Sequence, residues 1–244
     1  MKKLFKAIRH GDIDEVKAIL EKNPEAISSI AAPPPKKDMG QSPLQVAIKV
    51  SEYEIAQYLI EQGADVNFME SEEDGSDWRT PVLHDAIRAA LMSLCYRDKK
   101  GANEGLKITE ELLKRGADPN KCASNTFMAL DECVSRAEDI LDNQEAYPTV
   151  QKEAEKMLAS LLDILLEHGA DFKEWANHGH YAGEGETNRE LFLDDFVPVP
   201  DKIQELTIRG KTSTTVYKGD IDRTAHTRAV MQAYCKKRDL FGSY

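Results

Sequence analysis

The sequence predicts an all-α solenoid of about four helix pairs, followed by a C-terminal capping segment. Three observations support this prediction. The tripeptide Gly-Ala-Asp follows an apolar helical segment three times, with its glycine at positions 63, 116 and 169. The interval is 53 residues each time, as expected of a chain built from one repeated unit. A second apolar segment precedes each of these helices, so each unit holds two helices.

The repeated tripeptide is predicted to end a helix and begin a tight turn. Apolar residues recur at helical spacing over residues 55–59, just before the first copy. Gly63 then lies where a left-handed backbone is common, and glycine adopts it without a Cβ clash. Asp65 and Asn67 have side chains that hydrogen-bond to nearby backbone. We therefore expect all three copies to form the same turn.

The helix pairs follow in chain order. Residues 4–23 align without gaps on residues 44–63, so the chain opens with a helix pair. The inner helices of the second, third and fourth units open at Leu44, Leu83 and Leu130. The distance from this leucine to the glycine that ends the outer helix is 19 positions in the second unit, 33 in the third and 39 in the fourth. Because helical periodicity continues through the extra residues, we predict longer helices rather than loops.

These units resemble ankyrin repeats. That family opens its inner helix with Thr-Pro-Leu-His-x-Ala and ends its outer helix with Gly-Ala-Asp-x-Asn. Residues 42–67 match best, with Ser42 for the threonine and Gln45 for the histidine. Residues 80–86 keep the opening words with one extra residue, and residues 130–133 are a degenerate version. The resemblance implies an irregular ankyrin-repeat solenoid with extended helices.

The resemblance covers about residues 3–172 and ends near Trp175. We therefore divide the chain into ankyrin repeats at residues 1–175 and a C-terminal capping extension at residues 176–244. The family generally recognises proteins and needs no cofactor, so the resemblance implies a protein partner. Fold analogy does not identify that partner.

The C-terminal extension contains three predicted elements. Residues 187–190 suit a helical capping box. Residues 206–217 alternate as in a short β-hairpin turning at Gly210 and Lys211. A final amphipathic helix should turn one stripe toward the stack, formed by Ala225, Ala229, Val230, Ala233 and Tyr234. These apolar groups are too few for an independent core, so we predict a cap on the last helix pair.

Composition limits the classes of partner. The 244 residues are 41% hydrophobic, which suffices for a core, and the net charge is −11. An acidic chain is poorly suited to bind nucleic acid or anionic lipid over its whole surface. No apolar run reaches membrane-spanning length, and charged residues interrupt any signal-peptide core near the N-terminus. None of the four cysteines forms a CxxC pair, so we expect a reduced, cytoplasmic compartment. We also expect a monomer.

No motif points to catalysis. A nucleophile elbow, a P-loop and a dinucleotide fingerprint are absent from the sequence, so we expect no catalytic residue, cofactor or metal. A metal site could draw on a glycine-rich loop, but such a loop is poorly preorganised and a solvated loop is favoured; its candidates are His168, His178, His180, Glu184 and Glu186. His84 matches the family's histidine, and the resemblance implies that it hydrogen-bonds within and between repeats.

The resemblance places partner binding on the concave face, at the hairpin tips and the far ends of the inner helices. Five positions after each opening leucine stand Arg9, Lys49, Arg88 and Ser135, with Arg136 adjacent. Stacked helices lie about 8–10 Å apart, so these residues are expected to form a basic ladder that holds an acidic partner segment. Ordinary solvated charge is the alternative.

The hairpin tips offer a second group of expected contact residues. These are exposed in the family's usual contact positions, and here they are Met39, Gln41, Trp78 and Arg79. Tryptophan and arginine are frequent hot-spot residues. Trp78 could instead pack against the acidic loop of residues 69–77.

The preferred hypothesis is a non-catalytic interaction module that acts as an adaptor, an inhibitor or an immunity-type protein. Two alternatives stay open. An enzyme with its site in residues 176–244 would show a pocket with convergent polar groups there. A purely structural homo-oligomer would sediment differently as its concentration changes.

Overall fold

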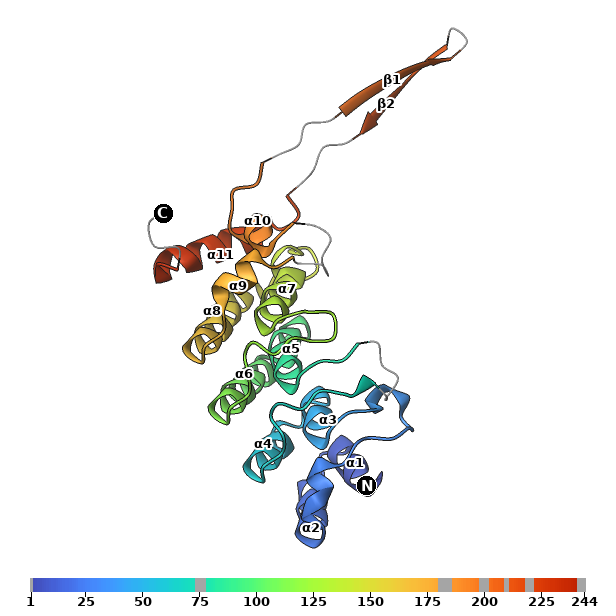
Figure 1. The fold of residues 1–244 in the computed structure, drawn as a ribbon, viewed down its shortest axis with the longest axis vertical. Coiled ribbons are helices and arrows are strands. Elements are labelled where there is room, and N and C mark those ends of the chain that lie inside the picture. The colour runs from blue at the N-terminus through green and yellow to red at the C-terminus, as the bar shows by residue number, and fades with distance from the viewer. Residues whose placement is uncertain are drawn as a thin grey trace.

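The computed structural model describes residues 2–72, 78–179, 186–197, 202–208, 211–217 and 222–240. For residues 202–208 and 211–217 it describes the backbone alone. Four helix pairs stack in chain order, as Figure 1 shows, which confirms the predicted all-α solenoid. The pairs are α1 (Lys2–Arg9) with α2 (Ile13–Lys22), α3 (Pro43–Lys49) with α4 (Tyr53–Glu61), α5 (Val82–Cys95) with α6 (Lys99–Lys114), and α7 (Ala129–Leu141) with α8 (Gln151–Glu167).

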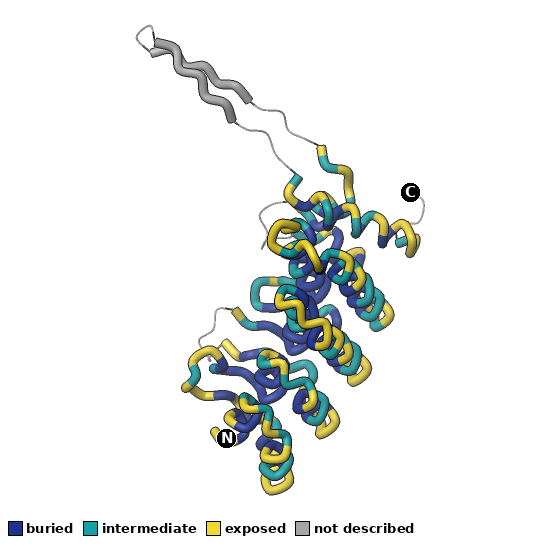
Figure 2. Tube along the Cα trace, turned by 180° about the vertical axis from the view of Figure 1, so that it is seen from behind, coloured by how far each residue is buried: buried dark blue, intermediate teal, exposed yellow. Residues whose placement is uncertain are grey.

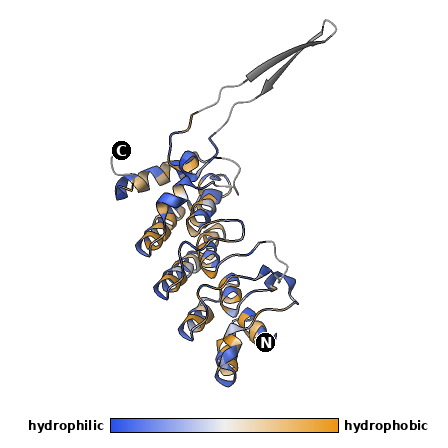
Figure 3. Ribbon diagram, viewed as in Figure 1, coloured by the Kyte–Doolittle hydropathy of each residue, from blue (hydrophilic) through white to orange (hydrophobic). Residues whose placement is uncertain are grey.

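The stack has two layers. The inner helices α1, α3, α5 and α7 contact one another in succession, and so do the outer helices α2, α4, α6 and α8. Buried residues run through the middle of the stack where the layers meet, and its rims are exposed (Figure 2). Hydrophobic and hydrophilic residues alternate along the helices of the stack (Figure 3), and the buried hydrophobic ones form one continuous cluster. Each helix is therefore stabilised mainly by the neighbours that cover its apolar stripe.

The three glycines of the repeated tripeptide end their helices as predicted. Gly63, Gly116 and Gly169 have φ values of +87°, +91° and +90°. A Cβ at these positions would meet nothing within 4 Å, so backbone conformation alone favours glycine there. Asp65 accepts a hydrogen bond from the backbone N–H of Asn67 at 2.9 Å, which holds the turn.

The asparagine that closes this motif has a role that the sequence did not reveal. The Asn67 amide donates to the carbonyl oxygen of Gly116 at 2.9 Å and accepts from the N–H of Asp118 at 2.8 Å. Asn120 makes the same two bonds one unit further along the stack, again at 2.9 and 2.8 Å. The expectation that the Asn67 side chain bonds nearby backbone was therefore wrong, because it links neighbouring units instead.

The longer helices predicted for the third and fourth units are confirmed. Helices α5, α6, α7 and α8 have 14, 16, 13 and 17 residues, whereas α3 and α4 have 7 and 9. Part of the extra length in the fourth unit is nevertheless a turn-rich connection at residues 142–150. A second irregular segment, between α2 and α3, contains the 3₁₀ helices η1 (Pro24–Ser28) and η2 (Lys36–Asp38).

Beyond α8 the chain forms α9 (Phe172–Asn177), α10 (Asn188–Phe192) and α11 (Ala225–Arg238). The predicted capping box is present: Thr187 accepts from the N–H of Glu190, whose carboxylate accepts from the N–H of Thr187. Strands β1 (Lys202–Ile208) and β2 (Lys211–Tyr217) pair antiparallel and extend beyond this end of the stack in Figure 1. The predicted turn was one residue too late, because Lys211 already pairs with Ile208.

Helix α11 turns only part of the predicted stripe to the stack: Tyr234 is buried and Val230 packs partly against the core, but the three alanines do not. Ala225, Ala229 and Ala233 are exposed, while the buried residues of the helix are Thr227, Arg228, Met231, Tyr234 and Cys235. The physical reason is hydrogen bonding. The carboxylate of Asp142 at the end of α7 accepts from the N–H of His226 and from the N–H and hydroxyl of Thr227. Polar residues therefore direct this contact, and the small alanine side chains stay outside.

Candidate partner-binding face

The ladder residues predicted from spacing stand on successive inner helices. Arg9 and Lys49 are the last residues of α1 and α3, Arg88 lies within α5 and Arg136 within α7. Neighbouring inner helices are in contact, so these residues follow one another along the stack. We call the surface formed by the inner helices and the loops that precede them the inner face, on the right of Figure 1.

Arginines of the ladder are bound to buried carboxylates. The Arg9 Nε lies 2.5 Å from Asp38, and the Asp38 side chain is only 4% exposed. Arg88 contacts both Asp85 and Glu132, whose side chains are each 2% exposed. A buried carboxylate needs a cation and hydrogen bonds to offset its desolvation. These arginines therefore stabilise the inner face, and much of their charge is neutralised there.

The other two ladder residues differ from this pattern. Arg136 bonds Asp139 at 2.7 Å and lies 3.4 Å from Glu132, so it joins the same acidic group. Lys49 is exposed, and the described part of the chain holds no ion pair to it. Ser135, the ladder position next to Arg136, is buried. Of the ladder, Lys49 is thus the best placed to attract a partner.

A hollow of about 310 Å³ opens on the inner face between the second and third units. Three segments far apart in the sequence meet there: the loop with η2, the end of α3, and the loop that leads into α5 together with the first turns of that helix. Five of the predicted contact residues are among its walls, and the full lining is Lys36, Lys37, Met39, Gln41, Lys49, Glu70, Trp78, Thr80, Asp85 and Arg88. Lys36 and Lys37 were not predicted, although both are exposed and precede the expected tip at Met39.

Two carboxylates, Glu70 and Asp85, form the floor of the hollow, and each accepts hydrogen bonds from neighbouring residues. Glu70 accepts from the Thr80 N–H at 3.0 Å and from the Gln41 amide at 3.3 Å. Asp85 accepts from the Gln45 amide at 3.2 Å. Burial raises the pKa of Asp85 to about 6, although Arg88 and Lys49 act to lower it. The floor is therefore largely anionic at neutral pH and loses charge in mild acid.

Two residues predicted to be exposed are not. Gln41 is 5% exposed because the loop folds back on itself: the Ala31 N–H donates to the Gln41 carbonyl at 2.8 Å. The Arg79 side chain is 16% exposed and bonds Glu72. The Arg79 backbone exchanges two hydrogen bonds with Ser124, which ties the loops of the third and fourth units together.

Met39 and Trp78 are the apolar contributors to the hollow. Met39 is half-buried and Trp78 is 55% exposed. The alternative that Trp78 packs on the acidic loop is undecided, because residues 73–77 lie outside the described residues. A large, half-exposed indole beside a hollow is the kind of surface that protein partners often bury.

His84 has the structural role that the resemblance implied. The ring is fully buried, and its Nε2 lies 3.1 Å from the carbonyl oxygen of Lys121 in the next unit. Because a carbonyl only accepts, this nitrogen carries the proton. Burial lowers the pKa of His84 to about 4, so the ring is neutral at physiological pH.

The same helix position forms a bridge in two other units. Gln45 donates to the Thr80 carbonyl at 3.0 Å. Asp131 accepts from the Asn188 amide at 2.7 Å, so α10 supplies the bond that a further repeat would otherwise make. Sequence comparison between units could have found this set, since each residue directly follows an opening leucine.

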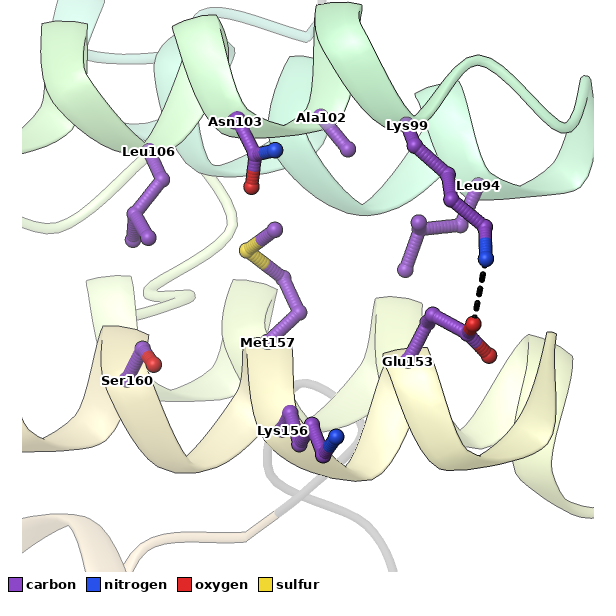
Figure 4. Close-up of a pocket in the computed structure, with 9 residues that line it drawn as sticks. All are labelled: Leu94, Lys99, Ala102, Asn103, Leu106, Glu153, Lys156, Met157 and Ser160. Atoms are coloured by element: carbon purple, nitrogen blue, oxygen red, sulfur yellow. Dashed lines mark hydrogen bonds and ion pairs between the residues drawn. The ribbon is translucent and has the colours of Figure 1, made fainter.

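Other hollows offer less chemistry. Figure 4 shows one of about 190 Å³ between the outer helices α6 and α8, where Leu94, Leu106 and Met157 lie beside a Lys99–Glu153 ion pair of 2.5 Å. A third, of about 340 Å³, includes Cys235 of α11. Burial raises the pKa of that thiol to about 12, which keeps it protonated and a poor nucleophile.

Metal-ligating side chains do not gather in the part of the chain that the structure describes, where no group of three or more is present. His180 and Glu184, two of the candidate ligands, lie outside those residues. His168 bonds the Ile164 carbonyl of its own helix at 2.8 Å. Among the described helices, none combines the length and apolar character needed to cross a membrane.

Part of the chain matches a known protein family. Residues 2–70 match the family model described as ankyrin repeats (3 copies). No curated protein matches the chain. The match covers the first two helix pairs and the loop after them, and the third and fourth pairs continue the same stack.

Proposed function

Since this chain is an ankyrin repeat protein, and such repeats generally mediate protein–protein interaction, we propose that it binds a partner protein through its inner face without catalysing a reaction. The hollow supports this proposal most directly. It places Met39, Gln41, Lys49, Trp78 and Arg88 around one opening, although they come from three separate segments. A rigid stack that presents loops side by side is suited to hold such a surface in one shape.

The partner class follows from the charges. Lys36, Lys37 and Lys49 are exposed on the inner face of a chain whose net charge is −11. A local basic area on an acidic protein steers an acidic segment toward that area and repels it elsewhere. An adaptor, an inhibitor and an immunity-type protein would each use such a surface. The ladder residues Arg9, Arg88 and Arg136 act here as supports of the face, alongside any contact they make.

The cell compartment and assembly state belong to the same proposal. A cytoplasmic monomer fits four unpaired cysteines, of which Cys133 and Cys235 are buried. Sedimentation velocity over a hundredfold range of concentration tests the monomer: a constant sedimentation coefficient agrees with it, and a rising one indicates the homo-oligomer.

The binding face is tested by an unbiased selection. A displayed library of random 12-residue peptides is selected on the full chain, and the footprint of the enriched peptides is mapped by amide NMR shifts. We expect the shifts to gather on the loops before α3 and α5 and on the inner helices. Failure to enrich any peptide, or a footprint on α2, α4, α6 and α8, would contradict the proposal.

A further inference from the structure

The hollow between the second and third units has a basic rim and an acidic floor. Lys36, Lys37 and Lys49 line it and are exposed, whereas Glu70 and Asp85 line it and are buried. Within the described residues, none of the three lysines is held by an ion pair. The two carboxylates are already engaged by Thr80 and by glutamine amides. The lysines of the rim can therefore pair with a negatively charged partner group. The carboxylates of the floor already accept hydrogen bonds from the protein itself.

Gln41 contributes one unused acceptor. Its side chain lines the hollow and is about 95% buried, and its Oε1 has no hydrogen-bond partner among the described residues. A buried amide oxygen without a donor is costly, so such groups usually mark a place where water or a ligand donates. The N–H of a peptide backbone is a donor of the right kind.

The size of the hollow limits the occupant. Sites for whole small molecules enclose about 300–1,000 Å³, and this one is at the lower end at about 310 Å³. It suits one side chain with its peptide unit better than a helix or a large cofactor. Trp78, 55% exposed at the edge, offers an apolar surface to a neighbouring residue of the same peptide.

We propose that this hollow anchors one glutamate or aspartate of an extended partner segment, with its carboxylate among Lys36, Lys37 and Lys49 and a backbone N–H donating to Gln41. The proposal rests on the proposed function and adds the chemistry of its central contact. In this proposal Lys36 and Lys37 determine specificity, whereas Arg88 stabilises the floor through its ion pair with Asp85.

The floor makes the anchor sensitive to pH. Asp85 faces Arg88, Lys49 and Glu70, and burial raises its pKa to about 6. As the pH falls from 7.5 to 5.5, most Asp85 side chains take up a proton, and their repulsion of a bound carboxylate is largely lost. A peptide glutamate stays largely ionised over that range. Binding of an acidic peptide should therefore strengthen on mild acidification, and Asp85→Asn should remove most of this dependence.

The test uses two blocked peptides of equal length, hexaglutamate and hexaglutamine, titrated into the ¹⁵N-labelled full chain. We expect hexaglutamate to shift the indole signal of Trp78, assigned with Trp78→Phe, together with the amides of Gln41 and Thr80. The triple variant Lys36→Gln, Lys37→Gln, Lys49→Gln should weaken binding about five- to tenfold. Lys22→Gln on α2 removes one positive charge from another surface and should leave the affinity unchanged.

Three results would overturn the anchor: equal binding of hexaglutamine, shifts confined to another surface, or no shift at millimolar peptide. These results do not decide the proposed function. The random-peptide selection has no bias toward acidic sequences, so enriched neutral peptides on the inner face would uphold the proposed function while the anchor fails.

Discussion

Arg88 of α5 and Glu132 of α7 form a bidentate ion pair across two repeats, with Nε to Oε1 at 2.9 Å and Nη2 to Oε2 at 3.0 Å. Arg88 also bonds Asp85 on its own helix at 3.0 Å. One guanidinium thus serves two buried carboxylates, and the geometry matches the planar fork that arginine presents. This pair connects the third unit to the fourth on the inner face.

Removing Arg88 is expected to destabilise the fold. Arg88→Ala leaves Glu132 and Asp85 buried without their cation, which should lower the free energy of unfolding by about 3–5 kcal/mol. Urea unfolding followed by circular dichroism measures this loss. The double variant Arg88→Met, Glu132→Met should recover the part of this loss that comes from Glu132, because Asp85 still lacks its cation. A loss below about 1 kcal/mol for Arg88→Ala would mean that the pair is a weak surface contact.

His84 should make the fold sensitive to acid in a predictable direction. Its folded pKa is about 4 and its ordinary value is 6.5, so the unfolded chain binds the extra proton more readily. The stabilising effect of neutral His84 is therefore complete above pH 6.5 and is lost as the pH falls toward 4, by about 3 kcal/mol in total.

His84→Gln tests this contribution, because Gln45 makes the equivalent bridge one unit earlier. We expect the variant to lose less stability than the wild type between pH 7 and pH 4.5, measured as the difference between paired urea titrations. Asp85 opposes the trend in both proteins, since its raised pKa favours the folded state at lower pH. Equal pH dependence in the two proteins would rule out the assigned role.

The asparagines of the repeated motif should act as links between units. Asn120→Ala removes the bonds to Gly169 and Asp171, and we expect a loss of about 1–2 kcal/mol in the free energy of unfolding. Lys173 occupies the corresponding place after the last glycine. Lys173→Asn is the matched control and should gain nothing, because no further repeat follows to accept the bond. A gain in that control would show that the asparagine acts within its own turn.

The C-terminal segment is expected to behave as a cap. A chain that ends before His180 loses the Asn188 bond to Asp131 and every contact of α11 with Asp142. We expect a lower melting temperature for the whole stack and concentration-dependent aggregation, since the apolar end becomes exposed. Asp142→Ala in the full chain should lower the melting temperature in the same direction but by less. A truncated protein that stays monomeric with an unchanged melting transition would instead identify residues 176–244 as an independent unit.

Features that depend on a few consecutive residues, such as helix ends and capping boxes, were predictable from the sequence. The helix-ending role of Gly63 depends only on its own backbone, and the box at Thr187 and Glu190 closes within four residues. The lateral role of Asn67 depends on Gly116, 49 residues away, and becomes visible only when the stack exists. Periodicity reports a helix's own pattern and carries no information about such neighbours.

The candidate site follows the same division. Counting from the opening leucines placed Arg88 and Lys49 correctly on the inner helices. The carboxylates that neutralise Arg9 and Arg88 come from a loop and from a neighbouring helix, so spacing could not reveal them. The face of α11 was misjudged for a related reason. Buried Arg228 donates to the carbonyls of Glu190 and Asp194, and these acceptors lie outside the helix pattern.

The contact between Asp142 and Thr227 joins residues 85 positions apart, whereas the links between the units of the stack span 29 to 54. During translation each repeat can therefore settle on its predecessor soon after it emerges, but α11 arrives last. At about 5–20 residues per second, α11 is completed at Arg238 roughly 3–14 seconds after Gly169 is made, and until then it cannot cover the end of the stack. In that interval the nascent chain exposes an apolar surface to chaperones and to other newly made chains. The delay before α11 docks therefore affects the yield of folded protein in the cell.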